Sequence, residues 1–268
     1  MPLHLSPSFR EQLAASDRSL VGMWACSGSP LVTEVAAGSG LDWLLIDMEH
    51  SANTLESTLL QLQVAAAYPI VPVVRVPFND AVAIKQVLDL GAQNIIVPMV
   101  SSADEARAAV AATRYPPHGV RGVGSALARS ARWNRVDGYL QDSARHTSLT
   151  VQIETRAGVD AAAEIASVDG VDAVFVGPSD LSASMGLLGQ QTHPDVVGAV
   201  ERVFAAVKGA GTPVGVNAFD PATADSYIAA GADFVAVGAD VAMLARASEA
   251  LAARFIPCLL YTSPSPRD

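Results

Sequence analysis

The sequence lacks the features that mark disulfide-rich, membrane-spanning or nucleic-acid-binding proteins. Only two of its 268 residues are cysteines, Cys26 and Cys258, and their spacing suits neither a disulfide framework nor a metal-binding motif. Basic residues are outnumbered, because 17 Lys and Arg face 27 Asp and Glu, and the formal net charge of −10 repels nucleic acids and anionic membranes. The most apolar stretch, residues 64–78, is interrupted by prolines and Arg75 and predicts no membrane span. The N-terminal segment has no continuous apolar run, so we expect no signal peptide and a cytoplasmic protein that acts on small molecules.

Two kinds of catalytic machinery are missing as well. The chain contains neither GxGxxG nor GxxxxGK[ST], so nothing supports nucleotide binding. No lysine lies at the end of an expected strand, since Lys85 falls in a helical pattern and Lys208 near a helix terminus. Schiff-base chemistry, which needs a buried lysine with a lowered pKa, is therefore disfavoured.

What the chain does contain is a regular alternation of short apolar runs and alanine-rich helical patterns. The runs predict parallel strands that are covered on both faces. They comprise residues 20–26, 43–47, 71–76, 95–99, 149–154, 172–176, 213–217 and 234–238. Eight strands with interleaved helices and no break in composition predict one α/β domain, a single (β/α)8 TIM barrel over residues 1–257. An open sheet of eight strands is the main alternative.

Helix signals support this alternation. Helical patterns cover residues 55–67, 80–90 and 102–114, and the last opens with Ser102 and Glu105 in capping-box spacing. Gly91, Gly211 and Gly231 each follow a helical pattern, where a left-handed C-cap is expected.

Two segments depart from the alternation. Residues 116–148 form a long, arginine-rich connection, and insertions of this length in a compact domain are usually functional or interfacial. Residues 258–268 (CLLYTSPSPRD) are rich in Ser and Pro and cannot continue the helix that ends near Phe255. We interpret them as a non-native, disordered tail.

Acidic residues at the carboxyl ends of two neighbouring strands suggest a metal site. In a (β/α)8 barrel these strand ends face the active-site mouth. Glu154 and Asp180 follow consecutive strands, and two carboxylates plus water suit an octahedral Mg²⁺ or Mn²⁺ ion that leaves positions open for a 2-oxo acid. Strand-end caps or ion-pair partners are the alternative roles.

Asp47, His50 and Arg75 lie at the ends of two other strands. Asp47 could orient His50 as a general base, directly or through water, although a capped loop histidine gives the same pattern. Arg75 lies inside an apolar strand, where its guanidinium could stabilise a developing enolate oxygen. A structural Arg75 that pairs with Glu49 or Glu154 is compatible with that role.

Residues around the sixth and first strands complete the expected pocket. Gly177-Pro178-Ser179-Asp180 precedes a helix, so backbone N–H groups there could receive a substrate carboxylate, although Gly-Pro-Ser is also ordinary turn chemistry. Trp24 lines either the pocket or the core. Cys26 is expected to be a small buried side chain rather than a nucleophile.

Long motifs in this chain resemble the HpcH/HpaI aldolase family. The likeness runs from about Ser19 to Phe255, through WLLIDMEH, PVVRVP, IIVPMV, RYPPHGVRGVGSALARSARWNR, VQIET, VFVGPSDLSASMG and FVAVGAD. It implies a class II pyruvate aldolase that uses Mg²⁺, Mn²⁺ or Co²⁺ and assembles as a homo-oligomer, a hexamer built as a dimer of trimers.

The resemblance also implies roles for single residues. Glu154 and Asp180 would bind the metal, His50 with Asp47 would be the acid/base pair, and Arg75 would hold the keto or enolate oxygen. The remaining implied substrate contacts are Gln152, Ser179, Asp180 and Trp24, with Asp89 reaching the site of a neighbouring subunit. Two other functions stay open: a citryl-CoA or malyl-CoA lyase, which needs a basic cluster for the CoA tail, and a non-catalytic barrel that serves as a scaffold.

Overall fold

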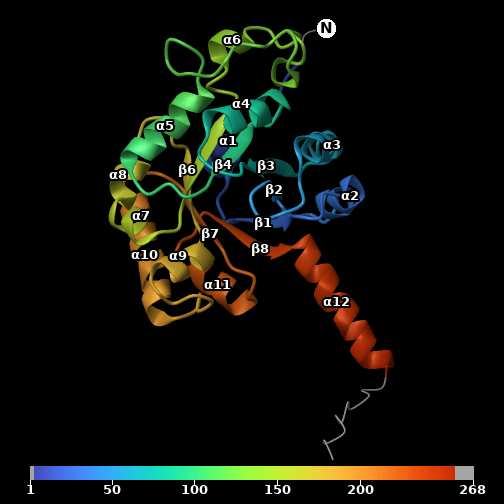
Figure 1. The fold of residues 1–268 in the computed structure, drawn as a ribbon, viewed down its shortest axis with the longest axis vertical. Helices are drawn as coiled ribbons and strands as arrows, with labels where there is room; N and C mark the ends of the chain where they lie inside the picture. Colours follow the sequence, from blue (N-terminus) through green and yellow to red (C-terminus); the bar gives the residue numbers. More distant parts are fainter. Residues whose placement is uncertain (1–2, 257–268) are drawn as a thin grey trace, which may run out of the picture.

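The computed structural model describes residues 3–256, and its strands form one closed parallel barrel in the order β1 to β8, with β8 paired to β1 (Figure 1). The strands are β1 Leu20–Ala25, β2 Trp43–Asp47, β3 Val71–Arg75, β4 Asn94–Val97, β5 Ser148–Ile153, β6 Ala173–Val176, β7 Val214–Asn217 and β8 Phe234–Ala239. Closure confirms the (β/α)8 barrel and shows that the open sheet is wrong. The expectations for Cys258 and for residues 258–268 lie outside the described residues.

Helices surround the barrel. They are α1 Phe9–Ala15, α2 Pro30–Ala37, α3 Leu55–Ala65, α4 Ala81–Asp89, α5 Ala103–Thr113, α6 Tyr139–Asp142, α7 Arg156–Asp160, α8 Ala162–Ala166, α9 Pro178–Ser184, α10 Pro194–Gly209, α11 Pro221–Ala229 and α12 Asp240–Phe255. A short 3-10 helix, η1 Arg129–Ala131, lies in the long connection between α5 and β5. None of the helices in the described part is long and apolar enough to span a bilayer.

Helix ends agree with the sequence in most respects. Gly91, Gly211 and Gly231 have φ values of 93°, 79° and 96°, which confirms their left-handed C-caps. The capping box expected at α5 is only half formed. Ser102 accepts a hydrogen bond from the Glu105 backbone N–H, but the Glu105 carboxylate accepts from the N–H of Ser101 instead of Ser102.

Aromatic rings fill the barrel near the amino-terminal ends of its strands. Phe9 from α1 packs against Trp43 and Phe234, with ring centroids 5.5 and 5.2 Å apart, and is fully buried. Gly22 on β1 makes room for this layer, because a Cβ there would lie 2.4 Å from the Trp43 ring. Since Trp43 and Phe234 are the first residues of β2 and β8, α1 closes the amino-terminal end of the barrel and leaves the carboxyl end open.

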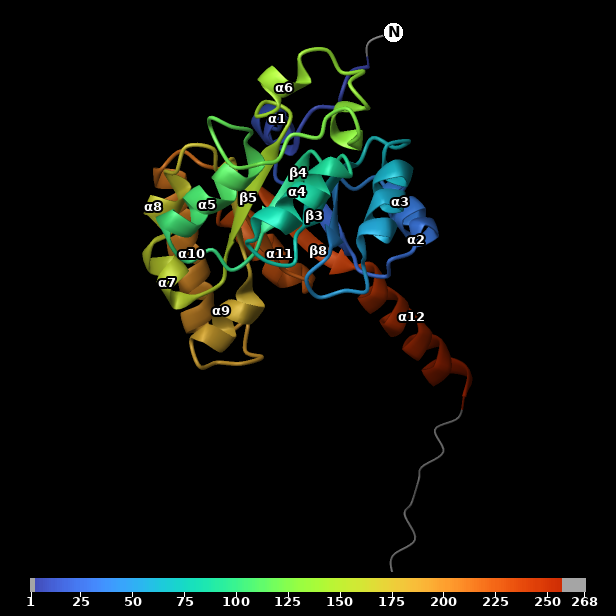
Figure 2. The same ribbon diagram turned by 45° about the horizontal axis from the view of Figure 1, so that its top comes forward.

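Two segments extend beyond the barrel in both views (Figures 1 and 2). The connection that carries η1 and α6 forms a lobe next to the N-terminus, tied to it by a hydrogen bond from the Leu3 N–H to the Arg135 carbonyl. On the other side, α12 projects away from the barrel, and only Asp240 among its residues is buried. This helix leaves apolar side chains uncovered along its length.

Candidate active site

A pocket of about 220 Å³ opens at the carboxyl ends of the strands. Its lining combines charged, amide and aromatic side chains from β1, β2, β3, β5, β7 and the first turn of α9. The lining residues are Trp24, Cys26, Asp47, His50, Arg75, Gln152, Gly177, Pro178, Ser179, Asp180, Asn217, Phe219 and Ala239. The barrel therefore brings together, at one mouth, most of the residues that the sequence singled out.

Arg75 is the fixed cation of this pocket. It ends β3 beside Asp47, the last residue of β2, and its Nε donates to Asp47 Oδ1 at 2.8 Å. Its Nη1 lies 2.7 Å from Glu49 Oε2, and its guanidinium lies 4.3 Å from the centroid of the Trp24 ring. With only 4% of its surface exposed, Arg75 is held by two carboxylates and one aromatic face.

Asp47 organises the turn that follows β2. Its Oδ1 accepts a hydrogen bond from the Glu49 N–H at 3.0 Å, and its Oδ2 accepts from the His50 N–H at 3.2 Å. The His50 ring is exposed and has Glu49, not Asp47, as its nearest carboxylate, with 3.9 Å between Nε2 and Oε1. The structure thus places Asp47 and His50 at one turn. Of the two predicted routes from Asp47 to the ring, directly or through water, the direct contact is absent among residues 3–256, and Glu49 lies beside the ring instead.

Glu154 is the most enclosed acid of the site. It follows β5 and is 2% exposed, its Oε1 accepts from the Met99 N–H, and its Oε2 accepts from Gln152 Nε2, both at 2.7 Å. Met99 adopts a left-handed backbone with φ of 57°, which is uncommon for a residue with a side chain and aims its N–H at Glu154. Gly177 faces the same carboxylate, because a Cβ there would lie 2.5 Å from Glu154 Oε2.

Burial and neighbouring negative charge act together on these acids. Desolvation, with the charges of Glu49 and Asp180 as smaller contributions, raises the pKa of Glu154 to about 7, against the lowering effects of the Met99 N–H and Arg75. Desolvation also raises the pKa of Glu49, although Arg75 opposes it. These carboxyl groups lie close enough to repel one another, so the pocket favours an added positive charge.

The donor set fits a hard cation that completes its shell with water or substrate. Glu154 and Asp180 supply carboxylate oxygens, and the buried Gln152 Oε1 has no hydrogen-bond partner within residues 3–256. No cluster of three or more His, Cys, Asp or Glu side chains suited to a metal occurs in that part of the chain. The described side chains therefore do not fill the coordination shell of an ion by themselves. This suits Mg²⁺ and Mn²⁺, which commonly keep several non-protein ligands.

The first turn of α9 supplies backbone donors beside Asp180. Pro178 occupies the first helical position, so the N–H groups of Ser179 and Asp180 belong to the first turn, where they have no partner within the helix. The Ser179 hydroxyl instead accepts a hydrogen bond from Gln191 Nε2 at 2.8 Å.

Trp24 lines the pocket and also belongs to the core, so its two expected roles coexist. Its indole Nε1 donates to Asn217 Oδ1 at 2.7 Å, and Phe219 stands at the same side of the mouth with 47% of its surface exposed. Asn217 and Phe219 are pocket residues that no sequence motif indicated. Asn217 ends an expected strand, and a search for amides as well as charges at strand ends would have found it.

Cys26 is not poised as a nucleophile. Desolvation, followed by the charges of Asp47 and Asp240, raises the pKa of its thiol to about 12. Asp240 accepts the backbone N–H groups of Cys26 and Ser27 at 2.8 and 3.0 Å, which ties the start of α12 to the loop after β1.

Asp89 lies elsewhere in the molecule. It ends α4, receives a 2.9 Å hydrogen bond from Arg121 Nη2, and lines a separate hollow with Leu127 and Trp133. Within one chain it does not join the pocket, so its expected substrate role depends on a neighbouring subunit.

The family model described as HpcH/HpaI aldolase/citrate lyase matches residues 20–247. The chain belongs to this family. It is 51% identical over 248 residues to the 4-hydroxy-2-oxo-heptane-1,7-dioate aldolase of Salmonella dublin, which covers 92% of this chain and 94% of the relative. The family and these relatives make the chain a carbon–carbon lyase of the aldolase type, as the resemblance implied.

Solved structures agree with this assignment. An HpcH/HpaI aldolase/citrate lyase family protein from Burkholderia cenocepacia J2315 superimposes with a TM-score of 0.88 at 41% identity, and covers 92% of this chain and 98% of its own. The citrate synthase SbnG has a TM-score of 0.82 at 30% identity, with coverage of 92% and 96%. The barrel scaffold of the family is thus shared by this chain over nearly its whole described length.

Proposed function

We propose that the protein is a class II aldolase that joins pyruvate, or a related 2-oxo acid, to an aldehyde and cleaves 4-hydroxy-2-oxo acids in reverse. The observation that carries the proposal is the grouping of Asp180, Gln152 and Arg75 around one pocket. Glu154 does not itself line the pocket but is hydrogen-bonded to Gln152, which does. A substrate such as 4-hydroxy-2-oxoheptanedioate is supported by the 51% identical relative named for it.

In this proposal Glu154 and Asp180 hold a divalent metal, Mg²⁺, Mn²⁺ or Co²⁺. Such an ion supplies Lewis acidity at the keto oxygen of a bound 2-oxo acid. Gln152 anchors Glu154 through its Nε2 and keeps its own Oε1 free for the coordination shell or the substrate. The N–H groups of Ser179 and Asp180 bind the substrate carboxylate at the first turn of α9.

Proton transfer is assigned to the turn after β2. His50 removes a proton from the methyl carbon of pyruvate, directly or through water, and the resulting enolate carbon attacks the aldehyde carbonyl. The new alkoxide then takes up a proton, and cleavage follows the same steps backward. Asp47 fixes the backbone of the turn and Glu49 faces the His50 ring, while the Arg75 guanidinium stabilises the oxygen that becomes negative.

The pocket favours an aldehyde substrate over a CoA thioester. Of the Lys and Arg residues in the described ranges, Arg75 alone lines it, and Asp47 and Glu49 already neutralise that charge. A citryl-CoA or malyl-CoA lyase needs further cations for the CoA tail. Cleavage of a CoA thioester at a rate comparable with retro-aldol cleavage would reverse this preference.

Assembly into a homo-oligomer is part of the proposal, with a hexamer as the expected form. Met243, Leu244 and Leu251 on α12 are 59%, 66% and 61% exposed, and an isolated helix of 16 residues is marginal in water, so such an apolar face favours burial against another surface. Asp89 then acts as a substrate contact across the interface. A cytoplasmic location stays a prediction.

The test follows exchange of the methyl protons of pyruvate for deuterium by NMR, with and without Mn²⁺. Glu154→Gln removes a proposed metal ligand and Arg75→Ala removes the cation at the developing enolate, so each should slow exchange by about 10²–10³. Glu164→Gln on the exposed face of α8 is the matched control and should keep the full rate. Undiminished exchange in EDTA would refute the metal-dependent scheme. Separately, product formation from pyruvate with a panel of aldehydes would identify the acceptor.

A further inference from the structure

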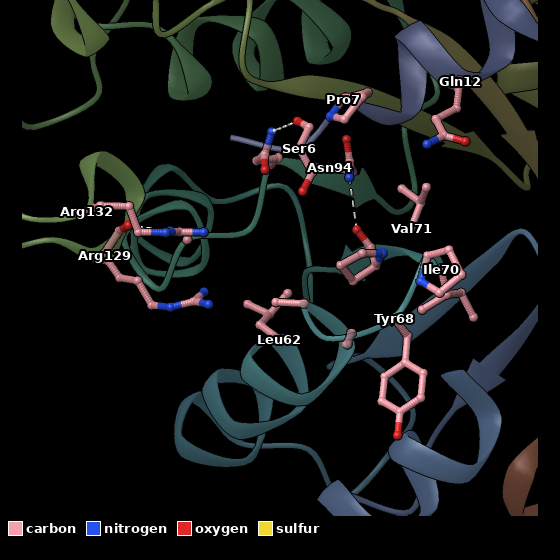
Figure 3. A pocket seen from close by; sticks show the side chains of 16 residues that line it. Ser6, Pro7, Gln12, Leu62, Tyr68, Ile70, Val71, Asn94, Arg129 and Arg132 are labelled. Carbon is pink, nitrogen blue, oxygen red and sulfur yellow. Dashed lines mark hydrogen bonds between the residues drawn. The ribbon is translucent and has the colours of Figure 1, made fainter. Parts of the chain in front are cut away.

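A second cavity, of about 230 Å³, lies at the amino-terminal ends of the strands, opposite the active site at their carboxyl ends. Figure 3 shows side chains that line it. Its wall includes the amino-terminal ends of β3 and β4, the end of α3 and the turn at Gly91, and the long connection after α5 closes it from one side. Its lining contains no Asp or Glu side chain, although the whole chain carries a net charge of −10.

Two guanidinium groups from the connection point into this cavity, those of Arg129 and Arg132 (Figure 3). Each side chain is half-buried, and neither has a carboxylate within 4.0 Å among residues 3–256. Arg129 Nη1 donates to the Leu90 carbonyl at 3.0 Å, which caps the end of α4, and Arg132 Nη1 donates to the Arg129 carbonyl at 2.5 Å. The other N–H groups of both side chains have no acceptor in the described part of the chain.

The lowered pKa values of both arginines show that this arrangement is unfavourable for two positive charges. Desolvation, with repulsion from Arg132 second, lowers the pKa of Arg129 to about 10, and desolvation lowers the pKa of Arg132. Cations that are removed from water without a partner are unfavourable. Elsewhere the chain gives buried arginines acidic partners, as it does for Arg75 and Arg121.

The backbone is shaped to hold the pair in place. Arg132, Trp133 and Asn134 have φ values of 49°, 56° and 60°, and three successive non-glycine residues in the left-handed region are rare. Gly91 supplies the space opposite, because a Cβ there would lie 2.8 Å from Arg129 Nη1 and 2.9 Å from Arg132 Nη1. A strained turn and a glycine thus keep both guanidiniums close to each other and to the cavity.

From the free N–H donors, the missing counter-charge and the enclosed volume, we propose that this cavity binds a small oxyanion of the phosphate type, separate from the substrates of the active site. The planar guanidinium offers paired N–H groups that match two oxygens of one anion. Two of the three amides in the lining are already engaged, since Gln93 donates to the Ser6 carbonyl and Asn94 to the Pro72 carbonyl. The arginine pair therefore provides the recognition, and a bound anion removes the repulsion between its members.

Inorganic phosphate is the probe, added to the full chain in EDTA at constant ionic strength set with chloride. Isothermal titration should show saturable binding, and the melting temperature should rise with phosphate concentration. Arg132→Gln should weaken phosphate binding by at least tenfold, and Arg132→Lys, which keeps the charge but loses the paired donors, should weaken it less. Arg107→Gln on the exposed face of α5 is the control and should bind as the parent does.

Three outcomes would overturn the proposal. The first is no saturable phosphate binding by the parent chain, which needs no variant and so does not depend on folding. The second is binding that Arg75→Lys abolishes and Arg132→Gln preserves, because phosphate would then occupy the active site. The third is an Arg132→Gln chain of smaller assembled mass with unchanged phosphate affinity, because the arginine pair would then face a carboxylate of a second copy.

Discussion

Replacing Gly177 tests the geometry of the proposed metal site without removing any of its ligands. Its backbone, at φ −102° and ψ 90°, is one that alanine adopts without strain, but the added Cβ would lie 2.5 Å from Glu154 Oε2 and 2.7 Å from Gln152 Nε2. Gly177→Ala should therefore displace the carboxylate and weaken Mn²⁺ binding by about tenfold or more, as changes to the groups that orient metal ligands do. Titration calorimetry measures this directly.

Gly209→Ala is the matched control for that substitution. Gly209 ends α10, and a Cβ there meets nothing within 4 Å. It should leave Mn²⁺ affinity unchanged. Equal affinity of the Gly177→Ala chain would show that Glu154 and Gln152 are not held against Gly177 in the metal-bound protein.

The raised pKa of Glu154 makes a second prediction at this scale. Its folded value of about 7 lies above its ordinary value of 4.5, so this group stabilises the metal-free protein below pH 4.5 and loses that contribution as pH rises through 7. A bound cation needs the ionised form. Apparent Mn²⁺ affinity should therefore rise by up to about tenfold per pH unit to near pH 7 and then level off, with release of a proton. Calorimetry in two buffers of different ionisation enthalpy counts that proton, and a flat affinity from pH 5.5 to 8 would contradict the assignment.

Single residues also show where sequence reasoning reaches its limit. Arg75, Asp47 and Glu154 could be selected because a charge inside an apolar strand is costly without a partner. Glu49 was named only as a partner of Arg75, because the sequence does not show which carboxylate in Asp47-Met48-Glu49-His50 faces the histidine ring. That choice depends on the turn, which Asp47 fixes through two backbone hydrogen bonds.

At the scale of elements, α1 contributes more than its seven residues suggest. Phe9 closes the amino-terminal end of the barrel and contacts Trp43 and Phe234. Phe9→Ala should lower the free energy of unfolding by about 3–5 kcal/mol, because the barrel cannot collapse to fill the cavity. Urea denaturation of Phe9→Ala beside Phe78→Ala, whose ring is 57% exposed, provides the measurement and its control. Equal losses for the two variants would mean that α1 does not seal the barrel in solution.

Elements differ in how well the sequence predicts them. All eight strands were found, with ends shifted by at most two residues, because a strand covered on both faces leaves a continuous apolar run. The elements η1 and α6 within residues 116–148 were not assigned. This segment has no apolar period, and its shape depends on contacts with α4 and on left-handed turns at Arg132 to Asn134.

At the scale of the whole molecule, α12 is the feature that one chain leaves incomplete. The helix begins at Asp240, which is tied to Cys26 and Ser27, and then leaves the barrel with Leu244 66% and Leu251 61% exposed (Figure 1). A 16-residue helix is marginal alone in water, and the proposed assembly would give α12 a surface to pack against. Because α12 starts at the pocket mouth, assembly also bears on the site.

Leu244→Glu with Leu251→Glu should therefore reduce the assembled mass, since two charges would be buried in the interface at high cost. The two residues are exposed in one chain, so the barrel itself should still fold, and circular dichroism should keep its signal. Light scattering coupled to gel filtration measures the mass, and Arg246→Gln on the same helix, whose side chain pairs with Glu249 at the surface, should keep the parent assembly. An unchanged mass for the double variant would place the subunit interface elsewhere than on α12.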